Sequence, residues 1–421
     1  MNHLESEGFQ KVSTVDESLR VFLNAVGRPR IRLESIAANR ALGRVLGEDV
    51  LADRFLPAVD RSVVDGFAVR SEDLKTATKA KPAKLNIVGE SRLGKPCRVT
   101  VSAGKAVVMA TGSMMPSGAD AVVMVEETFA LPGGLVEVYS QAVPGQHISR
   151  KGEDATPGKQ ILRKGRRLRP EDIGIMKALG RTKIRVARKP KVGVISTGDE
   201  LVESAAKMKL GKIVDLNRPI LSGLLEQLGA VPVDMGIARD REREVTIALR
   251  RALKVSDAVL ISAGSSVGKR DFIPKCINSL GKPGMLVHGV AMRPALPTGL
   301  AMARGKPIVS LPGFPVSAMI AFRAFCRPLI ATLSGTRAEN ELTVRAVLKD
   351  RINGLHGHRT YVRVTLTHSA EGLAAEPVKT QRSSALMSMV DANGIVTIPE
   401  GVATVEAGQV VEVAVNGEIE S

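Results

Sequence analysis

Three segments of the chain combine small residues, hydroxyl groups and carboxylates at a spacing that suits a phosphorylated ligand. They are 196-STGDEL-201, 262-SAGSSVGKRDF-272 and 311-LPGFPVS-317, and each follows an apolar run that reads as a strand. Small residues let backbone N–H groups approach a phosphate, and the N-terminus of a helix favours an anion. Carboxylates beside the phosphate can bind Mg²⁺. Together the three segments predict a pocket for a phosphorylated ligand.

A fourth cluster, 57-PAVDRSVVDGFAVR-70, places Asp60 and Asp65 on either side of Ser62, with Gly66 next. Its oxygens could coordinate a metal. The simpler interpretation is an ordinary Asp-Gly turn between two strands. The residues of this cluster alone leave both interpretations open.

Two common phosphate motifs and a zinc site are excluded. No GxGxxG follows a strand and opens a βαβ unit, which argues against a dinucleotide site. The run around Gly268 and Lys269 has Ala263 and Arg270 where a P-loop requires Gly and Ser or Thr. The six histidines are scattered and form no metal-binding pair.

The three segments belong to a stretch in which strands and helices alternate. The expected strands are 191–196, 231–237, 258–262 and 307–311, and the expected helices are 217–228, 241–254 and 316–325. This alternation predicts a parallel, doubly wound α/β sheet. Ligands bind such sheets at the carboxyl ends of the strands, where the three segments fall.

The rest of the chain predicts further modules. Thr14 and Glu17 form a capping-box pattern that opens an amphipathic helix, and Gly27 closes it. Residues 46–155 are rich in Val, Gly and Pro and predict a β-rich module. The tail from about 340 alternates again and predicts a small barrel or sandwich. The fold class we expect is multidomain α/β plus β.

Composition indicates a soluble globular protein. The chain has 421 residues, of which 44% are hydrophobic and 24% charged, and this length suggests about three domains. No uncharged apolar stretch approaches the ~20 residues of a membrane span. The N-terminus does not read as a signal peptide. Three widely spaced cysteines favour a reducing compartment, so we expect a cytoplasmic protein with no membrane partner.

The net charge of +17 is concentrated in one segment. Residues 163–191 hold twelve Lys or Arg and two acids, and no aromatic residue. Because the whole chain has no Trp and two Tyr, it lacks the stacking platforms of single-strand binders, and we expect no nucleic-acid partner. The segment is either a solvated basic surface or a surface for polyanionic partners.

The motifs together resemble the molybdopterin molybdenumtransferases, the molybdenum-insertion family also found as the C-terminal part of gephyrin. The resemblance runs from about residue 10 to about 415. The motifs that carry it are 62-SVVDGFAVR-70, 110-ATGSMMPSGADAVVMVEE-127, 152-GED-154, 195-ISTGDEL-201, 215-DLNR-218, 239-RD-240, 265-SSVGKRD-271 and 311-LPGFPVSA-318.

The resemblance implies an activity and an organisation. Family members insert molybdate into adenylylated molybdopterin, with Mg²⁺, and release AMP. They form homodimers whose active site lies between the β-rich domain of one subunit and the α/β domain of the other. Acceptor molybdoenzymes or their chaperones are possible partners. The domains implied here are an elongated linker domain (1–45 and 155–187), a β-rich inserted domain (46–154), a molybdopterin-binding α/β domain (188–336) and a C-terminal β-barrel (337–421).

The resemblance also implies roles for individual residues. The carboxylates expected to be catalytic are Asp65, Glu200, Asp240 and Asp271, and the same four with Asp199 are the expected Mg²⁺ ligands. The residues expected to bind substrate are Thr111, Arg150, Asp154, Ser265, Ser266, Gly268, Arg293, Pro312 and Pro315.

Some positions depart from the family pattern. Gly289 and Leu296 stand where Lys is common, and Ser149 replaces an Arg. Arg293 keeps one charge in a forked form that is not equivalent to Lys. Each lost cation at an oxyanion site weakens binding by about 1–3 kcal/mol. The alternative hypothesis is therefore a divergent paralog that binds molybdopterin or a partner without inserting metal.

Overall fold

The structure, a computed structural model, describes residues 12–263, 272–370 and 372–419. The chain divides into two compact units, which are described one at a time. Unit 1 holds the described residues up to Ser35, Gly43–Gly47 and the chain from Arg185 onwards. Unit 2 holds Ile36–Leu42 and Glu48–Ile184. The division falls within the paired strands β1 (Leu33–Ala37) and β12 (Lys183–Ala187).

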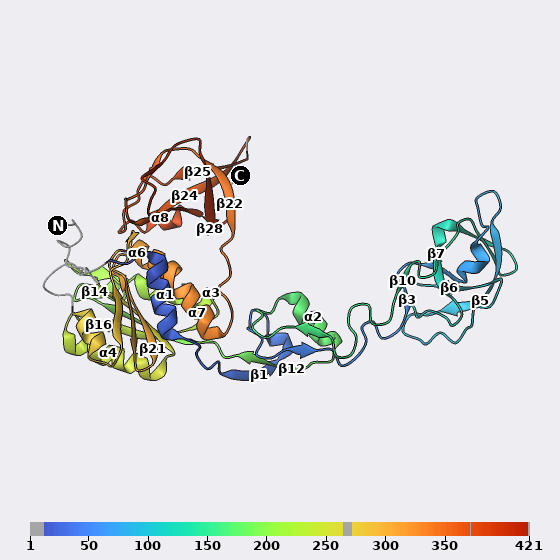
Figure 1. Cartoon of the computed structure of the whole chain (residues 1–421), viewed down its shortest axis with the longest axis horizontal. Helices are drawn as coiled ribbons and strands as arrows, with labels where there is room; N and C mark the ends of the chain where they lie inside the picture. The colour runs from blue at the N-terminus through green and yellow to red at the C-terminus, as the bar shows by residue number, and fades with distance from the viewer. Residues whose placement is uncertain (1–11, 264–271, 371, 420–421) are drawn as a thin grey trace. The chain divides into compact units, whose positions relative to one another are not determined.

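A six-stranded sheet in the order β16-β13-β17-β21-β20-β18 forms the centre of unit 1 (Figure 1). The first four strands are parallel. β20 runs antiparallel to them, and the edge strand β18, which pairs antiparallel with β20, runs in their direction again. The strands are β13 (Lys191–Thr197), β16 (Val231–Ala238), β17 (Ala258–Ala263), β18 (Gly284–His288), β20 (Gly299–Ala303) and β21 (Lys306–Pro312).

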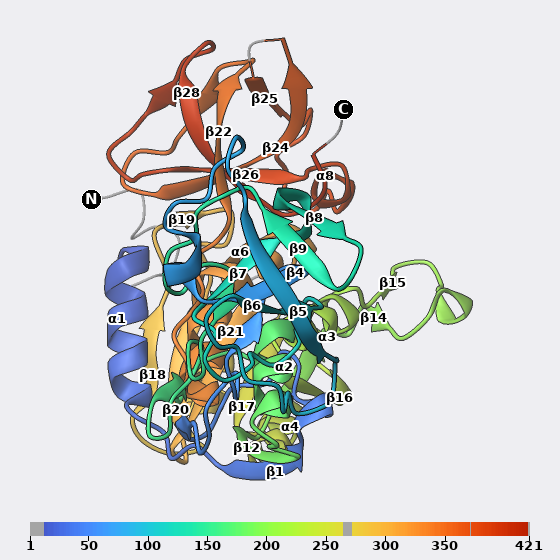
Figure 2. The same ribbon diagram turned by 90° about the vertical axis from the view of Figure 1, so that its right-hand side faces the viewer.

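Helices cover both faces of this sheet, because each helix has an apolar stripe to bury. One face carries α1, α3, α6 and α7, whose apolar side chains share a core with Val194 and Leu260. The other face carries α4 and α5, which pack on Ile195 and Ile261. Figure 2 shows α1 beside β18 and β20. The helices are α1 (Val15–Val26), α3 (Asn217–Gln227), α4 (Glu242–Val255), α5 (Ile273–Asn278), α6 (Pro315–Ala321) and α7 (Arg327–Ser334).

The C-terminal part of unit 1 is a closed five-stranded barrel. Its strands pair in the ring β24-β25-β22-β28-β26, and β26 pairs back to β24. A short strand from the α/β part, β19, adds to β24 in parallel, with Arg293 opposite Thr360. The remaining elements of unit 1 are β14 (Leu201–Val202), β15 (Ile213–Val214), β19 (Met292–Arg293), β22 (Thr343–Leu348), β23 (Ile352–Asn353), β24 (Arg359–Ser369), β25 (Gly372–Pro377), α8 (Met387–Val390), β26 (Gly394–Ile398), β27 (Thr404–Val405) and β28 (Val410–Val415).

Unit 2 is built on a six-stranded sheet in the order β7-β4-β6-β5-β9-β8. Gly66 is needed in β4 because a Cβ there would lie 1.8 Å from the carbonyl oxygen of Val123 in β7. The elements of unit 2 are β2 (Val50–Leu51), β3 (Arg61–Ser62), β4 (Gly66–Val69), β5 (Ala83–Ser91), β6 (Lys105–Met109), β7 (Ala121–Met124), β8 (Thr128–Leu131), β9 (Leu135–Val138), β10 (Ile148–Ser149), β11 (Gln160–Leu162) and α2 (Pro170–Ala178).

The predicted fold class is confirmed. The doubly wound sheet, the β-rich module and the C-terminal barrel are all present. The N-cap predicted at Thr14 also forms, since its hydroxyl oxygen accepts from the backbone N–H of Glu17 at 3.3 Å. The structure groups α1 with the α/β sheet, so the four-domain division, which set residues 1–45 with 155–187, stays a proposal.

One helical run, Pro315–Ser334, is long and apolar enough to cross a membrane by length and composition. Most of it (61%) is buried inside the protein. Its residues Val316, Phe325 and Leu329 belong to the main core of unit 1. These observations identify it as the core helix of a globular unit.

Candidate functional site

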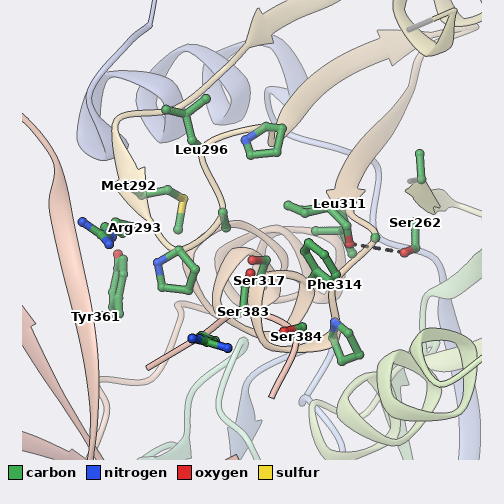
Figure 3. Close-up of a pocket in the computed structure, with 18 of the residues that line it drawn as sticks. Ser262, Met292, Arg293, Leu296, Leu311, Phe314, Ser317, Tyr361, Ser383 and Ser384 are labelled. Atoms are coloured by element: carbon green, nitrogen blue, oxygen red, sulfur yellow. Dashed lines mark hydrogen bonds between the residues drawn. The ribbon is translucent and has the colours of Figure 1, made fainter. Parts of the chain in front are cut away.

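A cavity of about 2210 Å³ opens at the carboxyl ends of the parallel strands of unit 1. The α/β part contributes residues at the ends of β13, β17 and β21, and the barrel contributes the segments 351–362 and 377–384. Figure 3 shows Ser262, Leu311 and Phe314 at one side of the cavity and Arg293 with Tyr361 at the other. The predicted residues Glu200, Arg293, Pro312 and Pro315 all line it.

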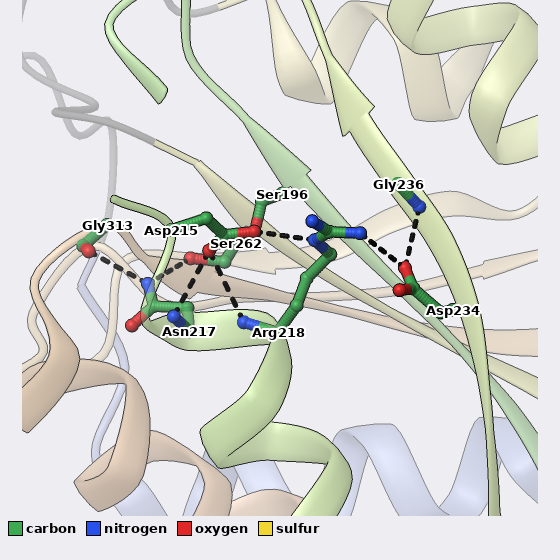
Figure 4. Close-up of polar contacts among 8 residues, drawn as sticks. All are labelled: Ser196, Asp215, Asn217, Arg218, Asp234, Gly236, Ser262 and Gly313. Atoms are coloured by element: carbon green, nitrogen blue, oxygen red, sulfur yellow. Dashed lines mark hydrogen bonds and ion pairs between the residues drawn. The ribbon is translucent and has the colours of Figure 1, made fainter. Parts of the chain in front are cut away.

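A network of polar side chains fixes the cavity wall where α3 begins (Figure 4). The buried carboxylate of Asp215 accepts from Ser196 Oγ at 2.9 Å and from Arg218 Nε at 2.6 Å. Arg218 also binds Asp234 at 2.5 Å. Asn217 Nδ2 donates to Ser262 Oγ at 2.5 Å and to the carbonyl of Gly313 at 2.8 Å. The network therefore ties three strand ends to the first turn of one helix.

Three predicted carboxylates gather in the turns that follow β13 and β16. The backbone N–H of Asp240 donates to Asp199 Oδ1 at 3.3 Å. Burial, together with the nearby charges of Glu200 and Asp199, raises the pKa of the Asp240 carboxyl. Gly198 leaves room for this arrangement, because a Cβ there would lie 2.8 Å from Glu200 Oε1 and displace the carboxylate. Within the described residues none of the three carboxylates forms an ion pair.

The opposite part of the cavity wall is rich in cations. Arg293 comes from β19, and Arg351 and Arg382 come from the barrel. None of the three forms an ion pair within the described residues. Cations that line a cavity without carboxylate partners attract anionic ligands.

Two predicted residues of unit 2 bind each other. Thr111 donates its backbone N–H to Asp65 Oδ1 at 2.7 Å and its hydroxyl to the same oxygen at 3.0 Å. The carbonyl of Asp65 accepts from the backbone N–H of Val125, which follows β7. Asp65 is thus held at the end of three neighbouring strands, β4, β6 and β7, which is more than an ordinary Asp-Gly turn provides.

Arg150 and Asp154 lie in one loop of unit 2. Arg150 Nη1 donates to Asp60 Oδ2 at 2.9 Å, and the backbone N–H of Lys151 donates to Asp60 Oδ1 at 2.7 Å. These two donors hold the pKa of Asp60 below its usual range. The backbone N–H of Asp154 donates to the carbonyl of Leu56. No hydrogen bond within the described part of unit 2 joins Arg150 or Asp154 to Asp65.

Comparison with known proteins covers nearly the whole chain. The family model "MoeA N-terminal region (domain I and II)" matches residues 13–180, "Probable molybdopterin binding domain" matches 193–332, and "MoeA C-terminal region (domain IV)" matches 345–415. The molybdopterin molybdenumtransferase of Bacillus subtilis is 33% identical over 90% of this chain and 89% of its own length. A Mycobacterium tuberculosis relative named molybdopterin molybdenumtransferase 2 is 34% identical over 90% of this chain and 94% of its own.

This chain belongs to the molybdopterin molybdenumtransferase family.

Solved structures agree with this assignment. The molybdopterin biosynthesis MoeA protein of Pyrococcus horikoshii OT3 superposes with a TM-score of 0.83 at 32% identity, covering 96% of this chain and all of that one. A Pyrococcus furiosus molybdenum cofactor biosynthesis protein, at 24% identity and a TM-score of 0.60, supports the fold alone.

Four predicted site residues of this family member, Ser265, Ser266, Gly268 and Asp271, lie outside the described residues. Their proposed roles therefore stay predictions. Asp199, Glu200 and Asp240 lie together, and Arg293, Pro312 and Pro315 share the cavity with Glu200. Asp65, Thr111, Arg150 and Asp154 belong to unit 2.

Arg363, a fully buried arginine of the barrel, is not among the predicted site residues. Its Nε and Nη1 have no hydrogen-bond partner in the described part of the chain, and burial lowers its pKa to about 10. Its backbone N–H and carbonyl bind the side chain of Gln381, which lines the cavity next to Arg382. The signal in the sequence is a single cation inside an apolar strand run, 361-YVRVTL-366.

Proposed function

We propose that this chain inserts molybdate into adenylylated molybdopterin and releases AMP, the final step of molybdenum cofactor biosynthesis. The observation that carries the proposal is the cavity of unit 1, which presents Glu200 at the strand ends and arginines from β19 and the barrel. A substrate with a pterin, a diphosphate and an oxyanion needs both kinds of group. Nothing in the structure or the comparisons favours a paralog without insertion activity.

The carboxylates at the strand ends fit a divalent cation. None of them forms an ion pair within the described residues, and burial, together with the charges of Glu200 and Asp199, raises the pKa of Asp240. Among those residues no group of three or more His, Cys, Asp or Glu has the arrangement of a metal site. Mg²⁺ commonly takes one or two carboxylates and completes its shell with water and substrate phosphates. We therefore assign Glu200 and Asp240 as its ligands, where the cation would offset the charge of the diphosphate.

The arginines of the cavity would bind the anionic oxygens of the substrates. Arg293, Arg351 and Arg382 can each donate hydrogen bonds in a fork that matches oxyanion geometry. Arg363 has two unused donors behind the segment that contains Gln381. Pro312 and Pro315 hold a stiff turn at the cavity wall, and Phe314 between them offers an aromatic face to a pterin.

An AMP-release assay tests the proposal. The purified protein is given adenylylated molybdopterin and Mg²⁺, with and without molybdate, and AMP is quantified. We expect AMP release that requires molybdate and falls at least 10²-fold in Glu200→Gln, with Glu226→Gln, an exposed residue of α3, as the matched control. Ligand binding without AMP release in either condition would contradict the proposal and support the paralog.

The assembly and the partners are part of the same proposal. We propose a cytoplasmic homodimer, which sedimentation equilibrium would test. Acceptor molybdoenzymes would dock on the basic segment 163–191 through Arg163, Lys177 and Lys183, which are exposed. Arg166 and Arg169 are unsuitable for a test because they pair with Asp172 and Glu171. Charge reversal of the three exposed cations should lower cofactor transfer to an acceptor and leave AMP release unchanged; an equal fall in both would contradict docking.

A further inference from the structure

The two polar atoms of the side chain of Asn217, the first residue of α3, differ in their hydrogen bonding. Its Nδ2 uses both hydrogens, donating to Ser262 Oγ and to the carbonyl of Gly313. Because a carbonyl can only accept, the bond to Gly313 fixes which end of the amide carries nitrogen. Oδ1 therefore faces away from both partners.

Oδ1 of Asn217 has no hydrogen-bond partner among the residues that the structure describes, although Asn217 is only 6% exposed. A buried acceptor without a donor costs about 1–3 kcal/mol and requires an explanation. Oδ1 is not unpaired because donors are scarce in this region. The neighbouring Asp215 accepts from Ser196, from Arg218 and from the backbone N–H of Asn217.

The walls around Asn217 indicate what kind of donor is missing. Asn217 lines the cavity of unit 1 together with Pro312, Gly313 and Phe314. Phe314, which is 56% exposed, leaves its ring open to a ligand in this cavity. Apolar and aromatic walls with one oriented polar atom are typical of a site for a flat heterocycle.

We propose that Asn217 Oδ1 accepts a hydrogen bond from an N–H group on the ring edge of the pterin and is a specificity-determining residue of the site. The inference rests on the proposed function, because it assumes that the cavity holds molybdopterin. A site that contains a buried acceptor rejects a ligand without the matching donor, since the acceptor would then stay unpaired. Asn217 thus selects a pterin over a ring that presents only acceptors at that edge.

Binding of free pterin, followed by its fluorescence, tests the inference. The full chain is compared with Asn217→Leu and Asn217→Asp, using pterin, a derivative methylated at N3 and the 2-amino group, and AMP as probes. We expect Asn217→Leu to raise the Kd for pterin about tenfold or more and to leave the Kd for AMP within about twofold. Asn217→Asp keeps an acceptor at Oδ1 but loses the donor to the carbonyl of Gly313, so its Kd for pterin should lie between those of the wild type and Asn217→Leu.

The methylated pterin shows whether Asn217→Leu acts by removing a hydrogen bond to the pterin or by disturbing the structure of the site. If Oδ1 binds a ring N–H, the methylated pterin binds the wild type and Asn217→Leu equally weakly, because the interaction is already lost. An equal loss for pterin, methylated pterin and AMP in Asn217→Leu would show a structural role and overturn the inference. So would an unchanged Kd for pterin, or no pterin binding to the wild type.

The wild-type AMP-release assay distinguishes this inference from the proposed function. Molybdate-dependent AMP release together with no effect of Asn217→Leu on pterin binding overturns the inference alone. Selective loss of pterin binding in Asn217→Leu, with no AMP release by the wild type, overturns the proposed function alone.

Discussion

Thr111 donates two hydrogen bonds to a single oxygen of Asp65, one from its backbone at 2.7 Å and one from its hydroxyl at 3.0 Å. Both donors go to Oδ1, and Oδ2 accepts none within the described residues. The pair fixes the orientation of the carboxylate while leaving one oxygen for a ligand. An arrangement of this kind pre-organises a functional side chain.

Substitutions at this pair should separate charge from positioning. Asp65→Asn keeps an acceptor for Thr111 but removes the charge, so we expect a normal melting temperature and AMP release lowered at least 10²-fold. Thr111→Val removes one hydrogen bond to a charged group, worth about 1.5–3 kcal/mol, and should lower kcat about tenfold or more. Thr111→Ser keeps the hydroxyl and should therefore retain the wild-type kcat. Full activity of Asp65→Asn would exclude a role for the charge.

Asp60 should make the stability of unit 2 depend on pH. The backbone N–H of Lys151, together with Arg150, lowers the pKa of Asp60 in the folded state. Its stabilising contribution is then complete above the unfolded pKa of ~3.9 and is lost as pH falls through the lower folded pKa. Thermal melts of wild type and Asp60→Asn should differ at pH 7 and converge below about pH 4. A gap that widens on acidification would contradict this assignment.

Arg218 should be a major contributor to the stability of unit 1. Its side chain is 12% exposed and pairs with Asp215, whose side chain is 2% exposed. Arg218→Met leaves a buried carboxylate without its cation, a loss of about 3–5 kcal/mol. The urea midpoint of the unit 1 transition should fall, while Arg251→Met, on the exposed face of α4, should leave it unchanged. Equal midpoints for the two variants would show that the pair contributes little.

Lys212 should bind the substrate through its charge. It lines the cavity, and its Nζ donates to the backbone carbonyl of Asp199 at 2.5 Å, a neutral partner that leaves the positive charge available. Lys212→Met should raise the KM for adenylylated molybdopterin about tenfold with little change in melting temperature. The matched control is Lys207→Met in the same loop, where the lysine pairs with Glu203 in solvent. A similar KM for both variants would exclude the role.

Much of the α/β part could be predicted because its sequence signals are local. The apolar run before 196-STGDEL-201 and the Pro residues of 311-LPGFPVS-317 predict a strand end and a stiff turn, and β13, β21 and α6 form there. The strand β20, which is antiparallel to β21, and the edge strand β18 were not predicted. The short runs that form them, 284–288 and 299–303, lack a helix between them and depend on pairing with β21.

The site was less predictable, because it depends on contacts between distant residues. Asp65 and Thr111 are 46 positions apart and meet only through the sheet of unit 2. The barrel segment 377–384 reaches the cavity, and Arg363 contacts it at Gln381, through tertiary packing that no local pattern reveals. The unfilled acceptor of Asn217 is visible only once its two hydrogen-bond partners are placed.

Coupling of metal insertion to AMP release is tested most directly by the ratio of AMP to molybdenum-loaded cofactor. The purified chain is incubated with adenylylated molybdopterin, Mg²⁺ and molybdate, and AMP and molybdenum-loaded cofactor are quantified in parallel, the latter by reconstitution of an apo-molybdoenzyme. We expect equal amounts of AMP and loaded cofactor, and neither product without molybdate. AMP release without loaded cofactor at saturating molybdate would contradict this coupling.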